Sequence, residues 1–187
     1  MKINSLMLRA TALAAGALVA FAAFSGPPKG VPIKISYWGS GIETAVDSDQ
    51  DPFGLKLSLT MAEAKGSFGA SSAYITSEFA VDPTITCPAG YLPLRLFQST
   101  SVVNFANGDQ LFGSVSDGEM CLDFDPMTGS GSGYYFGDAK GEYVGGTGRF
   151  ASATGAFYST YTGFNLEPAL TGFRSITGEI KGRVVLR

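Results

Sequence analysis

The side chains that could perform chemistry in this chain are carboxylates, tyrosines and arginines, because its 187 residues include no histidine. That absence excludes Ser-His-Asp and Cys-His catalysis and every zinc site that uses an imidazole. A catalytic carboxylate would have to lie in an apolar interior that raises its pKa. Glu78 is the best candidate, since it is a lone acid in a run, residues 73–81, that is otherwise apolar or hydroxylic. Ordinary burial statistics favour the alternative of an outward-facing glutamate.

Two further groups of acidic residues could suggest a cation site. Glu119, Asp123 and Asp125 fall on one face of an expected strand, opposite apolar residues. The acidic run at residues 47–52 resembles the start of an EF-hand loop, but Pro52 stands where that loop requires glycine. We expect both groups to be solvated, and no metal site is predicted.

The two cysteines, Cys87 and Cys121, are expected to form one disulfide if the chain is exported. The chain-entropy model assigns such a bridge about 3–4 kcal/mol of stabilisation. A disulfide would leave no thiolate nucleophile, whereas two separate free thiols are the alternative.

Aromatic and small residues alternate along residues 134–144. Tyr135 and Tyr143 share one face of this expected strand with Gly137, Ala139 and Gly141. Small residues between aromatic ones suit the interior of a tapering barrel. Tyr135 and Tyr143, together with Glu78, are therefore the candidate pocket residues.

Residues 144–155 form a glycine-rich connector that is expected to serve backbone geometry. Phe150 should fill apolar space, while Arg149 should turn to the opposite side and face water or a carboxylate. The segment loosely fits a dinucleotide-binding fingerprint, but β-forming residues follow it where that motif requires a helix. A tight connection between strands is the preferred interpretation, and its structural glycines are Gly145, Gly146, Gly148 and Gly155.

The remaining elements indicate an all-β fold. Asn107-Gly108 predicts a two-residue hairpin turn, because a type I′ turn needs positive φ at both central positions. Residues 87–93, with two prolines, are expected to form a longer loop. About eight alternating segments, with little helix and no repeat, predict either a sandwich or a barrel. A single antiparallel barrel is preferred because closure removes exposed strand edges.

The N-terminus has the pattern of an export signal. Lys2 and Arg9 precede an apolar run that ends near residue 24, followed by small residues. We expect a signal peptide at 1–25, a linker at 26–31 and the barrel domain at 32–187, in a secreted or periplasmic protein. A retained anchor is the alternative, but no stable membrane span is expected after processing. Removing Lys2 and Arg9 from the 13 basic residues leaves 11 against 16 acidic ones, and this net charge of −5 argues against nucleic acid as a partner.

Two segments resemble the dirigent and allene oxide cyclase superfamily. The first resembles its G-G-T-G-x-F signature and comprises Val144, Gly145, Gly146, Thr147, Gly148 and Phe150, with Ala153 and Gly155 following. The second is similar to a segment of secreted bacterial relatives and comprises Phe105, Ala106, Asn107, Gly108, Asp109, Leu111 and Phe112. The resemblance implies an eight-stranded antiparallel barrel over residues 32–187, often trimeric, without a metal or organic cofactor. It carries over no catalytic residue, because none of the superfamily's pocket acids or arginines matches a position here.

Two functions remain open from the sequence. The preferred one is non-enzymatic binding of a small apolar molecule or of a surface partner. The alternative, implied by the resemblance, is a cofactor-free cyclase or dirigent-like stereochemical guide that would act by shape in a water-poor cavity. A homo-oligomer, either trimer or dimer, is compatible with both functions.

Overall fold

The structure is a computed structural model that describes residues 30–45, 56–125, 127–165 and 172–186. The predicted signal peptide, linker residues 26–29 and the acidic segment 47–52 lie outside these described residues. The first strand begins at Val31, one residue before the predicted start of the barrel domain.

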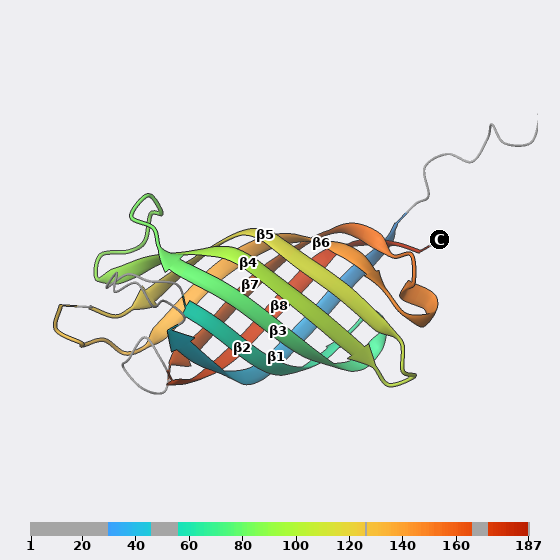
Figure 1. Cartoon of the computed structure of the whole chain (residues 1–187), viewed down its shortest axis with the longest axis horizontal. Coiled ribbons are helices and arrows are strands. Elements are labelled where there is room, and N and C mark those ends of the chain that lie inside the picture. The colour runs from blue at the N-terminus through green and yellow to red at the C-terminus, as the bar shows by residue number, and fades with distance from the viewer. Residues whose placement is uncertain (1–29, 46–55, 126, 166–171, 187) are drawn as a thin grey trace, which may run out of the picture.

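Eight antiparallel strands form one closed barrel, as predicted (Figure 1). Each strand pairs with its neighbours in the chain, and closure comes from the pairing of the first strand with the last. The helical content of the described residues is a single 3₁₀ turn, η1 (Gly148–Phe150). The strands are β1 (Val31–Ala45), β2 (Lys56–Gly66), β3 (Gly69–Val81), β4 (Tyr91–Phe105), β5 (Gln110–Asp123), β6 (Tyr134–Gly146), β7 (Thr154–Asn165) and β8 (Gly172–Val185).

β4 and β5 differ in extent from what the sequence pattern predicts. The predicted loop at 87–93 ends at Gly90, and Pro93 lies within β4 opposite Cys121. Pro93 has no N–H to donate, but its carbonyl accepts a hydrogen bond of 3.1 Å from the Asp82 N–H. Residues 110–115 and 119–125 belong largely to one strand, β5, whose pairing register shifts between Val115 and Asp117. This irregularity interrupts the alternation of side chains along the strand.

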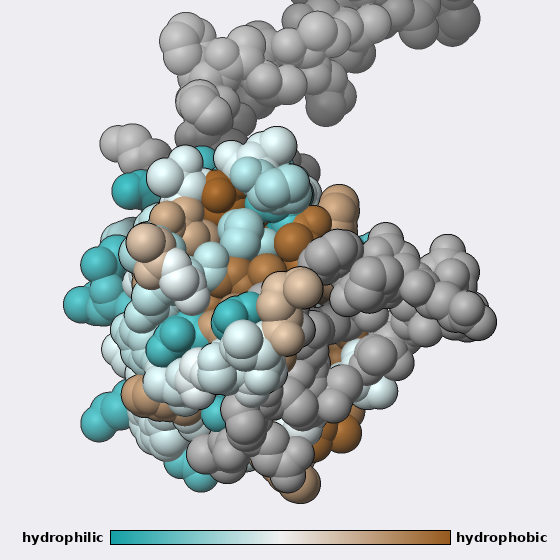
Figure 2. Space-filling view, turned by 90° about the vertical axis from the view of Figure 1, so that its left-hand side faces the viewer, coloured by the Kyte–Doolittle hydropathy of each residue, from teal (hydrophilic) through white to brown (hydrophobic). Residues whose placement is uncertain are grey.

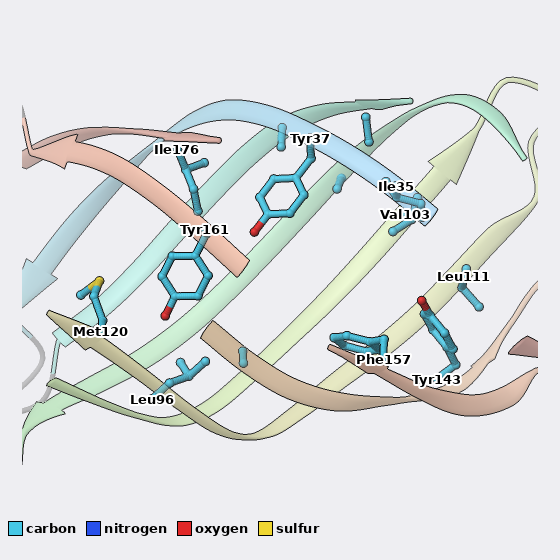
Figure 3. Packing of buried hydrophobic residues seen from close by; sticks show 14 of the residues in the cluster. Ile35, Tyr37, Leu96, Val103, Leu111, Met120, Tyr143, Phe157, Tyr161 and Ile176 are labelled. Atoms are coloured by element: carbon cyan, nitrogen blue, oxygen red, sulfur yellow. The ribbon is translucent and has the colours of Figure 1, made fainter. Parts of the chain in front are cut away.

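Alternate residues of every strand point into the barrel and form its core (Figure 3). On β6, Tyr135, Ala139 and Tyr143 are buried as the alternation predicts. The glycines between them leave room for aromatic rings from β7. A Cβ added to Gly141 would come within 2.6 Å of the Phe157 ring. The small residues of β6 therefore allow large residues from the next strand to fill the interior.

The barrel has two different ends. β1, β3, β5 and β7 finish at one end, on the left in Figure 1, which we call the loop end. The disulfide between Cys87 and Cys121, whose Cα atoms are 5.7 Å apart, ties the β3–β4 connection to β5 at this end. Figure 2 looks onto the loop end, where hydrophobic residues are visible between hydrophilic ones. At the other end, the aromatic end, the rings of Phe68, Phe105 and Phe150 pack together.

Candidate binding site in the barrel interior

The barrel encloses a cavity of about 80 Å³. The interior of an eight-stranded barrel is just wide enough for side chains to fill it, so a group of small side chains leaves space. The cavity wall includes several small side chains: Ala64, Ala73, Ser77, Ser99, Ser101 and Ala139. The volume suits about two or three water molecules or a compact organic molecule of similar size. It is well below the roughly 300 Å³ or more of pockets for drug-sized ligands.

Most of the cavity wall is apolar, and the polar groups on it are mainly hydroxyls. The hydroxyls of Tyr37 and Ser159 lie 3.1 Å apart and share a hydrogen bond. Ser77 donates a hydrogen bond of 3.0 Å to Ser99. The Tyr161 hydroxyl donates to a backbone carbonyl of β5 at 3.2 Å. The cavity wall includes all of these side chains: Tyr37, Ser77, Ser99, Ser159 and Tyr161.

Burial raises the pKa of both cavity tyrosines, Tyr37 and Tyr161, because the apolar surroundings disfavour a phenolate. Both phenols are therefore protonated at neutral pH. In that state they can donate hydrogen bonds, but they cannot serve as general bases.

Arg174 is the one charged residue among those described that lines this cavity. It projects inward from β8, and its side chain is only 3% exposed. Its Nη1 donates to Glu43 Oε1 at 2.9 Å, and its Nη2 donates to Thr60 Oγ1 at 2.7 Å. The guanidinium also lies 5.9 Å from the Phe79 ring centroid and 5.8 Å from that of Tyr135. Its Nε has no hydrogen-bond partner in the part of the chain that the structure describes.

Tyr135 and Tyr143 are buried but do not line the cavity, which differs from the prediction. Tyr135 donates its hydroxyl to the Ser175 carbonyl at 2.6 Å. Tyr143 packs on Phe157, with ring centroids 5.0 Å apart. Burial raises the pKa of both phenols. Both side chains belong to the hydrophobic core of the barrel.

Glu78 lies on the outer face of β3 and also does not line the cavity. Its neighbours Ser77 and Phe79 are the buried residues at this point of the strand. Because successive side chains point to opposite faces of a strand, the inward direction of Ser77 fixes the outward direction of Glu78. Glu78 is therefore an outward-facing glutamate, which is the alternative that burial statistics favour.

The sequence analysis missed the buried pair of Arg174 and Glu43. Both residues extend the alternation of inward-facing residues beyond the segments predicted from the sequence. Arg174 lies two residues before the buried Ile176, and Glu43 lies on the same strand face as Ile35 and Tyr37. A charged residue at an apolar position of a strand was the available signal. Pairing of β1 with β8 brings the two residues together across 131 positions of sequence.

The glycine-rich connector has the geometric role that was predicted. Gly145, Gly148 and Gly155 have φ values of 124°, 56° and 139°, which few other residues adopt. A side chain on Gly148 would also clash with the Asp109 carboxylate. Gly146 approaches the backbone of Gln110 so closely that no Cβ fits.

Arg149 and Phe150 seal the aromatic end together. Phe150 is fully buried, as predicted. Arg149 pairs with Asp109 at 3.2 Å, which confirms that it faces a carboxylate. The prediction that the two side chains turn to opposite sides is wrong, because the Arg149 guanidinium lies 4.8 Å from the Phe150 ring centroid. The η1 turn places both residues at the same end of the barrel.

The predicted hairpin at Asn107 and Gly108 is present, but its turn is shifted by one residue. The Gly108 N–H donates to the Phe105 carbonyl, so Ala106 and Asn107 are the central residues. Gly108 follows with φ at 86°, and the loop holds four residues.

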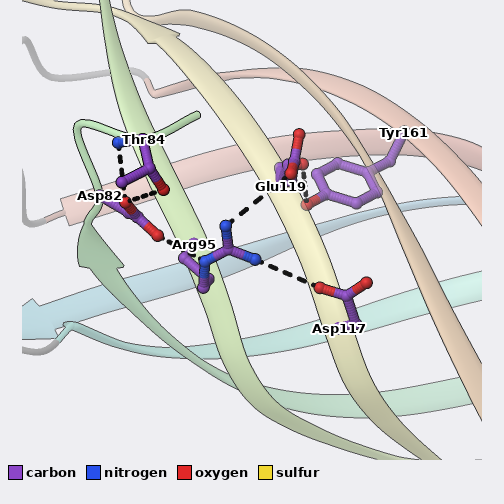
Figure 4. A network of polar contacts seen from close by, with 6 residues as sticks. All are labelled: Asp82, Thr84, Arg95, Asp117, Glu119 and Tyr161. Carbon is purple, nitrogen blue, oxygen red and sulfur yellow. Dashed lines mark hydrogen bonds and ion pairs between the residues drawn. The ribbon is translucent and has the colours of Figure 1, made fainter. Parts of the chain in front are cut away.

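The row of carboxylates on β5 is engaged in local structure (Figure 4). Arg95 pairs with Asp82 at 2.5 Å, with Asp117 at 3.3 Å and with Glu119 at 3.9 Å. The hydrogen bond from Arg95 and two from Thr84 lower the pKa of Asp82 to about 2.

Farther along the chain, Asp123 accepts hydrogen bonds from Ser132, and Asp125 accepts them from Met127 and Thr128. Within the described ranges, no group of three or more histidine, cysteine or acidic residues is placed to hold a metal ion.

Comparison of the chain with protein-family models, with curated proteins and with solved structures finds no match. None of the helices in the described residues has the length and hydrophobicity needed to cross a membrane.

Proposed function

We propose that this chain is an exported barrel that binds a small, largely apolar molecule in its interior without transforming it. The observation that carries the proposal is the cavity of about 80 Å³, which is lined mostly by apolar side chains, with a few hydroxyls and Arg174. Ligand sites are commonly concave and mostly apolar, with a few polar groups that fix orientation. The disulfide and the N-terminal pattern of residues 1–25 support export.

The chemistry of the cavity wall favours binding over catalysis. Arg174 is held in an ion pair, and a guanidinium is not deprotonated in proteins. The phenols of Tyr37 and Tyr161 have raised pKa values, and no carboxylate in the described part of the chain lines the cavity. A cyclase or stereochemical guide would therefore have to act through shape alone, and it too would first have to bind its substrate in this space.

Xenon tests the proposal, because this atom enters small apolar cavities. Methyl NMR spectra of the mature, disulfide-bonded chain are recorded under increasing xenon pressure. We expect saturable shifts at Ile35, Ile75 and Ile176, which line the cavity, and only small linear shifts at the exposed Ile42.

A variant that fills the cavity provides the control. Ala73 lines the cavity, so Ala73→Val should weaken the saturable shifts while leaving the other methyl signals in place. Shifts at Ile75 that are no larger than those at Ile42 in the unmodified chain would mean that the interior does not bind small molecules.

A surface-partner function is favoured by a separate observation on the outer wall. The exposed side chains of Ile42, Leu59 and Phe173 lie side by side on β1, β2 and β8, and Met61 lies opposite Tyr74 of β3. Contiguous exposed apolar surface of this kind commonly marks an interaction site. Because these residues carry no charge, a second copy of the chain can cover them without electrostatic repulsion.

Sedimentation equilibrium tests this self-association. Leu59→Glu should convert a dimer or trimer into a monomer, whereas Val144→Glu, at an exposed position of β6, should not. A wild-type chain that is monomeric at high micromolar concentration would rule out this function.

A further inference from the structure

Arg174, which lines the cavity, carries a hydrogen-bond donor that has no acceptor among the described residues. The Nη atoms of Arg174 are bound to Glu43 and Thr60, but its Nε–H has no partner among the described residues. This nitrogen belongs to a side chain that is only 3% exposed, on a residue that lines the cavity. A buried donor without an acceptor is costly, so such a group points to a ligand atom or to ordered water.

The cavity hydroxyls can donate further hydrogen bonds to a ligand, although each can also accept one. Tyr37 and Ser159 carry two hydroxyl hydrogens but share one hydrogen bond, and the same holds for Ser77 and Ser99. Among the described residues no carboxylate lines the cavity, and Glu43 already accepts a hydrogen bond from Arg174. The site is therefore suited to a molecule that accepts hydrogen bonds.

The charge balance of the interior decides between an anionic and a neutral acceptor. The positive charge of Arg174 is matched by Glu43 at 2.9 Å, and both side chains are almost completely buried. An anion in the cavity would add a third buried charge without a counterion, which is strongly unfavourable in an apolar interior. A neutral oxygen accepts the Nε–H without this cost.

We infer that the cavity binds a small neutral carbonyl compound whose oxygen accepts a hydrogen bond from Arg174 Nε–H, while its apolar remainder packs against the aliphatic wall. This inference rests on the proposed binding function and specifies its ligand class. Carboxylates of the same size are excluded by charge. Pure hydrocarbons of the same size can enter the cavity but leave the donor unsatisfied.

Three probes of four heavy atoms each test the ligand class: acetone, isobutene and acetate. They are titrated into the disulfide-bonded chain while the interior methyl signals and the Arg174 Nε–H signal are followed by NMR. We expect acetone and isobutene to bind with dissociation constants on the order of millimolar, as suits so few atoms. Only acetone should move the Nε–H proton downfield, and acetate should bind at least about tenfold more weakly than acetone.

Arg174→Lys separates the hydrogen bond from the ion pair. Lysine retains a positive charge opposite Glu43 but has no Nε–H group. In this variant acetone should bind about tenfold more weakly, while isobutene should bind as it does to the wild type. If the variant does not fold, the response of Nε–H in the wild-type chain decides the question by itself.

The outcomes distinguish this inference from the function on which it rests. If isobutene binds but acetone leaves Nε–H unmoved, the donor is satisfied by water only; the carbonyl inference then fails while interior binding stands. Acetate binding as tightly as acetone would overturn the charge argument. If neither isobutene nor acetone moves the interior methyl signals, the binding function itself fails.

Discussion

The two ends of the barrel each contain an arginine paired with a carboxylate, in very different surroundings. At the loop end, Arg174 and Glu43 are 2.9 Å apart, and their side chains are 3% and 4% exposed. At the aromatic end, Arg149 and Asp109 are 3.2 Å apart and are 40% and 17% exposed. The guanidinium of Arg149 lies over three packed phenyl rings, whereas Arg174 lines the cavity.

The difference indicates separate roles for the two pairs. Apolar burial of Phe150 and its neighbours can hold the aromatic end without help from the ion pair, because partly exposed pairs contribute little. A buried pair is seldom more stabilising than apolar side chains of the same volume. The presence of Arg174 and Glu43 in the core therefore fits a binding role better than a purely structural one.

Removing the carboxylate from each ion pair in turn should give the largest difference in stability between the two ends. Glu43→Gln leaves the Arg174 charge buried without a counterion and should lower the free energy of unfolding by about 3–5 kcal/mol. The matched change Asp109→Asn should lower it by about 1 kcal/mol or less. Urea unfolding of the disulfide-bonded chain measures both, and equal losses would contradict the distinction between the two ends.

At the aromatic end, the rings rather than the charge should carry the stability. Phe150→Ala removes a fully buried ring and should cost about 3–5 kcal/mol. Arg149→Met keeps the aliphatic packing, loses the cation–π contacts and should cost about 1 kcal/mol. The same urea experiment applies, and a greater loss for Arg149→Met would show that the ion pair seals this end.

The disulfide should matter for the loop end in particular. Replacing Cys87 and Cys121 by serine releases the β3–β4 connection and should lower the free energy of unfolding by about 2–4 kcal/mol. Amide hydrogen exchange should accelerate more in residues 82–90 than in residues 147–153 of the aromatic end. Uniform acceleration at both ends would argue against a local role.

Replacing the buried pair by apolar residues should have little effect on stability. The double variant Glu43→Leu with Arg174→Met should be as stable as the wild type, or more stable, because it removes two desolvated charges. It should also lose the preference for acetone over acetate. A double variant as unstable as Glu43→Gln alone would mean that the pair is required for folding.

The smallest effect concerns the surface pair of Arg95 and Asp82 near the loop end. Because the pKa of Asp82 is lowered to about 2 from its ordinary 3.8, its ionised form stabilises the fold above about pH 4. This stabilisation is lost as the pH falls towards 2. Arg95→Leu should raise the pKa of Asp82 towards its ordinary value, whereas Lys65→Leu on β2 should not. Carboxyl NMR titration measures the midpoint, and a value still near 2 in Arg95→Leu would contradict the assignment.

Much of the fold could be predicted from local patterns. Alternation along residues 73–81 and 134–144 is a property of short segments, because the side-chain period of a strand is two residues. The structural roles of Gly145 and Gly148 could likewise be predicted, since a positive φ leaves few choices of residue. The burial of Phe150 was also predicted. The disulfide followed from the presence of two cysteines in a chain with an export pattern.

The candidate site was not predictable in the same way. Glu78 is a lone acid among apolar and hydroxylic residues, which made it a candidate for the interior. Because Ser77 points inward, however, Glu78 lies on the outer wall. Tyr135 and Tyr143 point inward as predicted, yet they belong to the packed core and do not line the cavity.

The sequence by itself therefore determined the all-β class, the alternation within several strands and the glycine-rich connector, because alternation and glycine geometry act over a few residues. Only the tertiary structure decided that Arg174 meets Glu43 and that small side chains from different strands leave a common space. Those contacts depend on the pairing register and on the closure of β1 against β8, which join positions more than a hundred residues apart.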